Sequence, residues 1–89
     1  MMYLVETTPR FDRDFKKLDR YTQKMLKGWI VKNLLGTENP RQHGKALVGN
    51  LAGAWRYRIG EYRLLCHIDD GELVILALTV GHRREIYKR

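Results

Sequence analysis

The 89-residue sequence has no serine and a single cysteine, and these two absences limit the chemistry open to the protein. Without serine, a hydrolase built on a Ser-His-Asp triad is excluded. One cysteine cannot form an intramolecular disulfide, and Cys66 alternates with apolar positions. We therefore expect a buried, reduced thiol in a cytoplasmic protein.

Long apolar runs are also absent. The longest extends from Leu73 to Leu78, whereas a membrane-spanning helix needs about 20 apolar residues. Residues 1–5 are followed at once by Glu6, which is not typical of a signal peptide. We expect neither a membrane anchor nor an export signal.

The residues that usually hold metals and cofactors are scarce. Three histidines and one cysteine, with no carboxylates at ligand spacing, predict no metal centre. The glycines match neither common nucleotide-binding pattern, so we expect no cofactor. Asp69 and Asp70 precede Gly71 in a predicted turn, which argues against paired-carboxylate catalysis.

Positive charge is the strongest compositional feature. The net charge is +7 and the isoelectric point is near 9.9, which predicts a polyanionic partner. An anionic membrane is disfavoured, because no predicted helix combines a basic face with a broad apolar face. Nucleic acid is the favoured partner.

The stretch Ala54–Ile68 predicts a β-hairpin with a tight turn at Gly60-Glu61. Successive strand side chains alternate between two faces, so the apolar residues of both strands share one face. The opposite face then carries Arg56, Arg58, Arg63 and His67. Cations this close repel one another unless an anion lies among them, which predicts a phosphate ligand. A solvated strand face without a ligand remains the alternative.

The rest of the chain predicts a single α+β domain over residues 1–89, with the order β-α-α-β-β-β. An αα-hairpin packs on a four-stranded, mainly antiparallel sheet, in which the last strand pairs with the first. The first helix begins with Thr8 as N-cap and Pro9 as its first residue. Gly28 in the second helix suggests close helix–helix contact. The predicted ranges are strand 3–7, second helix 22–35, irregular segment 37–53 and last strand 72–80.

The basic and titratable residues fit one metal-free reaction, the cleavage of RNA by its own 2′-hydroxyl. This reaction needs a clamped phosphate, stabilised oxyanion charge, a base and an acid. Arginine clamps phosphate but is a poor proton donor. The predicted catalytic residues are Arg63, Arg83, His82 and Tyr87, and the predicted substrate-binding residues are Lys45, Arg56 and Arg58. A strand-end histidine without a role, and a tyrosine that packs on the sheet, remain the alternatives for His82 and Tyr87.

Two segments of the chain resemble the RelE/ParE toxin superfamily. They are Leu47-x-Gly49-x-Leu51-x-Gly53-x-Trp55-Arg56-Tyr57-Arg58-Ile59-Gly60-x-Tyr62-Arg63 and Val80-Gly81-His82-Arg83-Arg84-Glu85-Ile86-Tyr87. The resemblance implies a RelE-like fold and the toxin of a type II toxin–antitoxin system. It further implies a metal-independent mRNA endonuclease that acts in the ribosomal A site and binds a cognate antitoxin.

The resemblance also leaves questions open. The best-known RelE members carry lysines in place of Arg56 and Arg58, so which residue is the general acid stays undecided. ParE members share the fold but inhibit DNA gyrase, and this is the first alternative function. The second is a nucleic-acid-binding module whose arginines only hold the backbone.

Overall fold

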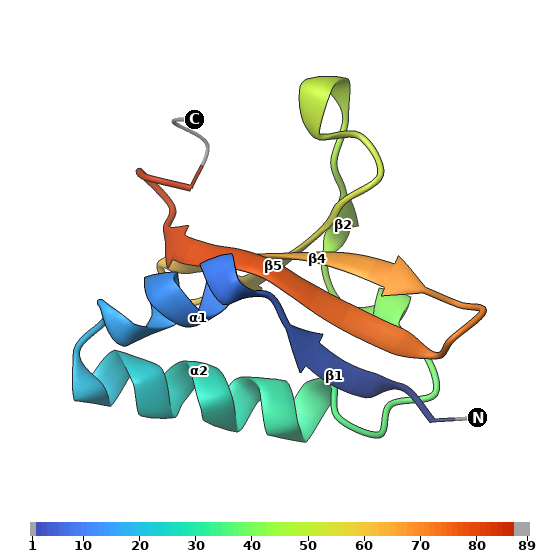
Figure 1. Ribbon diagram of the computed structural model, residues 1–89, viewed down its shortest axis with the longest axis horizontal. Coiled ribbons are helices and arrows are strands. Elements are labelled where there is room, and N and C mark those ends of the chain that lie inside the picture. Colours follow the sequence, from blue (N-terminus) through green and yellow to red (C-terminus); the bar gives the residue numbers. More distant parts are fainter. Residues whose placement is uncertain (1, 87–89) are drawn as a thin grey trace.

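The computed structural model describes residues 2–86 and contains two helices packed on one face of a five-stranded sheet (Figure 1). The elements are β1 (Leu4–Thr7), α1 (Pro9–Lys16), α2 (Arg20–Asn33), β2 (Lys45–Ala46), β3 (Trp55–Ile59), β4 (Tyr62–Asp69) and β5 (Val74–His82). Neither helix of this part of the chain is long and apolar enough to cross a bilayer.

The strand order is β1-β5-β4-β3-β2, with β1 parallel to β5 and every other pair antiparallel. The predicted fold class is confirmed, and so is the pairing of first and last strands. The predicted number of strands is wrong by one. The additional strand β2 pairs Lys45 with Arg56 and Ala46 with Trp55, within the segment predicted to be irregular. Two residues are too few to show a strand's alternation in sequence.

The helices begin as local sequence dictates. Thr8 caps α1 by accepting a hydrogen bond from Phe11 N on its Oγ1 (3.1 Å), and Pro9 occupies the first turn. Helix α2 begins at Arg20 and ends at Asn33, two residues earlier at each end than predicted. The proposed helix contact at Gly28 is wrong, because a Cβ atom built there would meet no other atom within 4 Å.

The last strand begins at Val74 rather than Glu72 because Leu73 adopts φ 55°, which interrupts the extended backbone. It continues to His82, beyond the predicted end. Only residues 74–77 pair with β1. Beyond them α1 covers the strand edge, and Thr8 Oγ1 donates to the carbonyls of Ala77 and Leu78 (3.1 and 2.9 Å).

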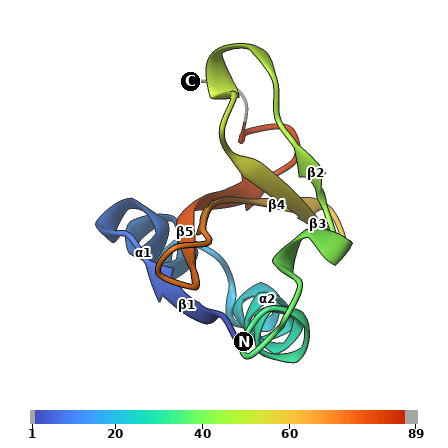
Figure 2. The same cartoon turned by 90° about the vertical axis from the view of Figure 1, so that its right-hand side faces the viewer.

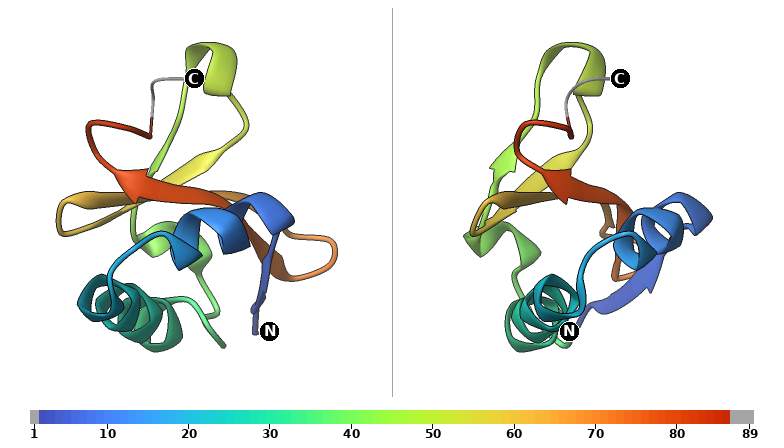
Figure 3. Two further views of the ribbon diagram at one scale, coloured as in Figure 1. Left: turned by 60° about the vertical axis from the view of Figure 1, so that its left-hand side comes forward. Right: turned by 90° about the vertical axis from the view of Figure 1, so that its left-hand side faces the viewer.

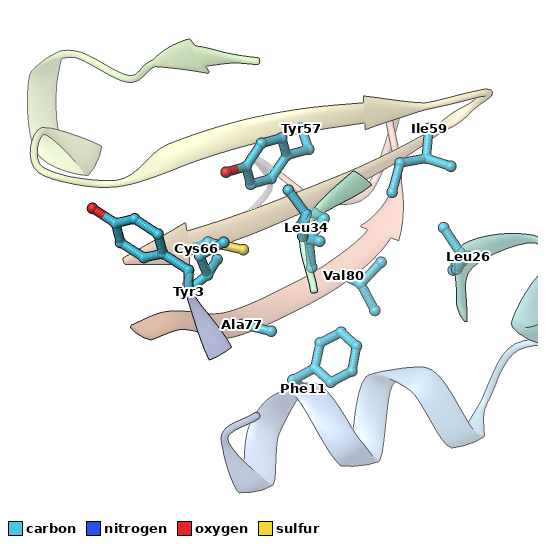
Figure 4. Close-up of a cluster of buried hydrophobic side chains, with 11 residues drawn as sticks. Tyr3, Phe11, Leu26, Leu34, Tyr57, Ile59, Cys66, Ala77 and Val80 are labelled. Atoms are coloured by element: carbon cyan, nitrogen blue, oxygen red, sulfur yellow. The ribbon is translucent and has the colours of Figure 1, made fainter. Parts of the chain in front are cut away.

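The core lies between the sheet and the helices (Figure 4). Its fully buried side chains are Tyr57, Leu26, Leu34, Leu64, Ile75 and Cys66. Cys66 is buried, as predicted, and this burial raises the pKa of its thiol. The Trp29 ring packs on Tyr57 with centroids 5.6 Å apart, as expected for a residue that contributes to the core.

Tyr57 offers a direct test of this core. Its hydroxyl donates to Pro40 O (2.6 Å), so Tyr57→Phe leaves a buried acceptor unpaired. We expect the free energy of unfolding at pH 7 to fall by about 1–2 kcal/mol, measured by urea titration. Tyr21→Phe, on a side chain that is 77% exposed, is the control and should change nothing.

The same pair of proteins tests the titration of Tyr57. Burial raises the pKa of Tyr57, so the hydroxyl stays neutral in the fold while the unfolded chain ionises near pH 10. The contribution of Tyr57 to the free energy of unfolding is therefore complete below about pH 10. It is lost as the pH rises further, because ionisation of the tyrosine stabilises the unfolded chain. The stability difference between wild type and Tyr57→Phe should therefore narrow above this pH. A constant difference would contradict this assignment.

Candidate nucleic-acid interface

The predicted cationic face exists and lies on the side of the sheet opposite to the helices. Residues Tyr57, Ile59 and Leu64 are buried in the core, so their strand neighbours point the other way. The register places Lys45 beside Arg56 in one row and Arg58 beside Arg63 in the next. Four of the seven predicted site residues therefore share one face.

Arg58 and Arg63 form the closest cationic pair of this face. Leu47 N donates to Ala54 O (3.0 Å), so the backbone polar groups of Ala54 point toward β2. Every second residue of a strand directs its N–H and C=O to the same side, so those of Arg58 also point toward β2 and away from β4. Arg58 and Arg63 are therefore a non-hydrogen-bonded pair, in which Cα atoms lie about 4.5 Å apart. Like charges in such a pair repel.

Counter-charge is missing from the β2–β3 half of the face. In residues 2–86, no carboxylate forms an ion pair with Lys45, Arg56 or Arg58. The Nε atom of Arg56 is buried and has no hydrogen-bond partner within the described part of the chain. A buried cationic donor without a partner is costly.

Arg63 differs from its neighbours because it is only 8% exposed. Its Nη1 donates to the carbonyls of Gly60 and Tyr62 (3.3 and 3.2 Å), which holds the guanidinium over the hairpin turn. Gly60 has φ 61° as the first central residue of this turn, the conformation of a type II′ hairpin. Alternation predicted the face of Arg63 but not its burial.

Arg83 lies at the end of the cationic face nearest to that turn. Its backbone N donates to Glu61 O (2.8 Å), and its Nε lies 3.3 Å from Glu61 Oε1. Residues 84–86 fold back on the sheet, since a Cβ atom at Gly81 would lie 3.5 Å from Ile86 Cδ1 and Ile86 is buried. Tyr87, a predicted catalytic residue, lies outside the described residues.

His82 lies on the other face of the sheet from Arg58 and Arg63. It pairs in register with Tyr62 and contacts the Tyr62 ring edge-on, with centroids 5.6 Å apart. Its Nδ1 accepts a hydrogen bond from Arg84 N (3.2 Å), so a neutral imidazole carries its proton on Nε2. Its predicted catalytic role stays a prediction.

The segment before β2 is fixed by contacts that sequence patterns did not indicate. The Arg41 guanidinium donates to both carboxylate oxygens of Asp70 (3.0 Å each), and the Tyr3 hydroxyl donates to Asp70 Oδ1 (2.6 Å). These hydrogen bonds hold the pKa of the Asp70 carboxyl below its usual value. Loop 39–44 is thereby tied to the β4–β5 turn and, through Asp70, to Tyr3 just before β1, which helps to position Lys45 next to Arg56.

Two other segments rise from the sheet on the side away from the helices (Figures 2 and 3). One is the connection that contains the short 3-10 helix Gly49–Leu51, and the other begins after His82. Among residues 2–86, no group of three or more histidines, cysteines or carboxylates could hold a metal ion. The cationic face itself presents guanidinium and ammonium groups, which bind phosphate.

Comparisons with known proteins identify this architecture. A family model for the ParE toxin of type II toxin–antitoxin systems (parDE) matches residues 5–87. The sequence is 36% identical to toxin RelG of Mycobacterium tuberculosis over the full length of both chains. A chain in the crystal structure of the toxin–antitoxin complex RelBE2 from M. tuberculosis matches with TM-score 0.84 at 34% identity, over 93% of this chain and 100% of that chain.

A more distant structure shares the fold. The isolated Escherichia coli RelE toxin matches with TM-score 0.71 and 24% identity, over 90% of this chain and 83% of that chain. Two helices on a mixed five-stranded sheet are thus the architecture of RelE toxins. The chain belongs to the ParE toxin family of type II toxin–antitoxin systems, within the RelE/ParE superfamily, and is RelE-like in structure. The resemblance stated from the sequence is confirmed.

The ion pair between Glu61 and Arg83 makes this interface testable. Because the carboxylate competes with an incoming phosphate for the guanidinium, Glu61→Gln should strengthen binding of single-stranded RNA at low salt. We expect about a two- to fivefold gain, the size of an exposed ion pair. Glu72→Gln, an exposed glutamate before β5, is the matched control. Weaker binding by Glu61→Gln would instead mean that Glu61 positions Arg83 for the ligand.

Proposed function

We propose that this toxin is a ribosome-dependent mRNA endonuclease that cleaves without a metal ion. The observation that carries the proposal is the cationic face of β2, β3 and β4, where Lys45, Arg56 and Arg58 have no carboxylate partner among residues 2–86. Such a face suits a phosphodiester backbone, and the kinship to RelG and RelBE2 supports the RelE-type activity.

The proposed reaction needs no nucleophile from the protein. The 2′-oxygen of the RNA attacks the adjacent phosphorus as its proton passes to a base. The bond between phosphorus and the 5′-oxygen then breaks as an acid donates a proton to that oxygen. The products are a 2′,3′-cyclic phosphate and a 5′-hydroxyl end, so atoms and charge balance with one proton accepted and one donated.

The side chains divide this work by their chemistry. Lys45, Arg56 and Arg58 hold the RNA backbone, because ammonium and guanidinium groups bind phosphate oxygens. Arg63 and Arg83 stabilise the charge that develops on the phosphate oxygens. Burial at the hairpin turn supports this role for Arg63, since a fixed donor loses little entropy on binding.

Proton transfer falls to Tyr87 and His82. Neighbouring guanidinium groups would lower the pKa of a tyrosine hydroxyl, so that more of it is ionised near neutral pH and able to accept a proton. The proton on Nε2 of His82 would make this residue the proton donor. Because its ring lies beside Tyr62, on the other face of the sheet from Arg58 and Arg63, this role requires the substrate to extend around the end of β5.

The proposed partners follow from charge and kinship. RelBE2 of M. tuberculosis is a toxin–antitoxin complex, and we infer a cognate antitoxin for this chain as well. A domain of net charge +7 suits an acidic, partly disordered partner that folds on binding. The substrate would be mRNA in the ribosomal A site, which implies action in the cytoplasm.

The experiment is to induce the toxin alone in cells and to map transcript 5′ ends, with a test for 2′,3′-cyclic phosphate ends. We expect new cuts in phase with codons and confined to translated messages. The double variant Arg83→Ala, Tyr87→Phe should reduce these cuts by about 100-fold or more, as when donors to a developing oxyanion are removed.

The control is Arg13→Ala, Tyr21→Phe, which alters the same residue types at exposed positions of α1 and α2. If the catalytic double variant cuts messages as well as this control does, the assignment of roles is wrong. Growth arrest with intact messages and double-strand DNA breaks would replace the proposal with gyrase inhibition.

A further inference from the structure

A cavity of about 280 Å³ lies at the outer edge of the sheet, where β2 stops pairing with β3. Its lining residues are Trp29, His43, Gly44, Lys45, Arg56 and Arg58. They come from α2, the loop before β2, β2 itself and β3. The volume is close to the lower limit for small-molecule sites, about 300 Å³, and suits one nucleotide rather than a larger ligand.

Two aromatic rings form one wall of this cavity. The His43 ring contacts the Trp29 ring edge-on, with centroids 5.7 Å apart. Trp29 also packs on Tyr57, and the backbone of His43 is held because its carbonyl accepts a hydrogen bond from Trp55 Nε1 (2.7 Å). The rings are thus positioned by the core before any ligand arrives. Preformed aromatic faces of this kind stack with unpaired bases.

The backbone of β3 supplies a second wall. Since Leu47 N bonds to Ala54 O, the N–H and C=O groups of Arg58 point toward the same edge. In the described part of the chain, β2 pairs only with Trp55 and Arg56. The edge of β3 at Arg58 therefore offers one backbone N–H donor and one backbone C=O acceptor. The hydrogen-bonding edge of a base can pair with such groups.

Gly44 permits the loop to lie this close to β3. It has φ 86°, and a Cβ atom there would lie 2.3 Å from Arg56 O and 2.6 Å from Trp55 Nε1. Any other residue would push the loop, and His43 with it, away from the strand. The glycine thus sets the width of the cavity.

The remaining side is cationic. Lys45, Arg56 and Arg58 line the cavity, no acidic residue is among its lining, and the buried Nε of Arg56 has no partner in residues 2–86. A phosphate at this position would meet up to three cations. Aromatic, backbone and cationic groups thus meet in one recess.

We propose that this recess binds one nucleotide of single-stranded RNA. Its unpaired base would lie with the wall formed by the His43 and Trp29 rings on one side and the edge of β3 on the other, and its phosphate would contact Lys45 and Arg56. The proposal rests on the proposed function, since it adds a base-reading subsite beside the phosphate that is cleaved. His43 and Trp29 are specificity-determining residues in this arrangement, with no part in proton transfer.

The test combines a protein variant with removal of single bases. The probe is a short single-stranded RNA with 2′-O-methyl groups, which cannot be cut, together with versions that each lack one base. His43→Ala keeps the backbone hydrogen bond to Trp55 and alters an exposed side chain, so the variant should fold. We expect it to weaken binding of the intact RNA by about 5- to 150-fold, the range for base–aromatic stacking.

Combining the His43→Ala variant with each base deletion gives a double-mutant cycle, which isolates the interaction between His43 and one base. For one position, removal of the base should weaken binding to wild type but not further to His43→Ala. Trp29→Phe, which keeps a ring in the core, should retain part of the affinity, and Tyr21→Ala, which removes an exposed ring from α2, should retain all of it. A change in the NMR chemical shift of the Trp29 indole N–H on RNA binding would provide independent evidence that the base lies beside Trp29.

The proposal is overturned if His43→Ala binds the intact RNA as wild type does, if it weakens all base-deleted RNAs equally, or if wild type binds no RNA at all. Failure of the proposed function is a separate result. Intact messages in cells together with the coupling described above would leave an RNA-binding recess without nuclease activity. Cuts in phase with codons, without coupling between His43 and any base, would support the proposed nuclease and contradict the proposed nucleotide-binding recess.

Discussion

The cationic face depends on the burial of one side chain, Tyr57. Its ring is fully buried against Trp29, and its hydroxyl bonds to Pro40 O, so it joins β3, α2 and the loop before β2. Because strand neighbours alternate, this burial forces Arg56 and Arg58 onto the opposite face. A register slip of one residue would bury two guanidinium groups and expose the ring. The core thus specifies the cationic face, and no separate device is needed to orient the arginines.

That orientation has a cost in the free protein. Arg58 and Arg63 face each other across β3 and β4, and cations at this spacing destabilise a strand pair. The buried Nε of Arg56 adds the cost of an unmet hydrogen bond. A polyanion that binds only the folded state would reduce the repulsion between these cations and raise stability by mass action. Strain of this kind is expected where a binding face is prepared before its ligand arrives.

Much of this arrangement could be predicted from the sequence. The alternation of Trp55 to Ile59 with the turn at Gly60 predicted the hairpin and its charged face, because both depend on local periodicity. Features that depend on tertiary register could not be predicted. These include the short strand β2, the burial of Arg63, the pairing of Arg41 with Asp70 and the position of His82 on the helix side of the sheet. For His82 the sequence offered only a strand end, and the face was decided by pairing with Tyr62.

The few acidic residues explain why the excess charge gathers where it does. Asp70 neutralises Arg41, Asp14 lies 3.9 Å from Arg10, and Glu61 holds Arg83. The first pair fixes the loop before β2, and the third lies at the turn between β3 and β4. Two carboxylates therefore flank the cationic face, Asp70 beside the loop before β2 and Glu61 at the hairpin turn, while Arg56 and Arg58 form no ion pair with a carboxylate in residues 2–86. This distribution, more than the net charge of +7, supports the proposed binding of a polyanion at β3, since a field focused by neighbouring cations exceeds that of solvated, scattered lysines.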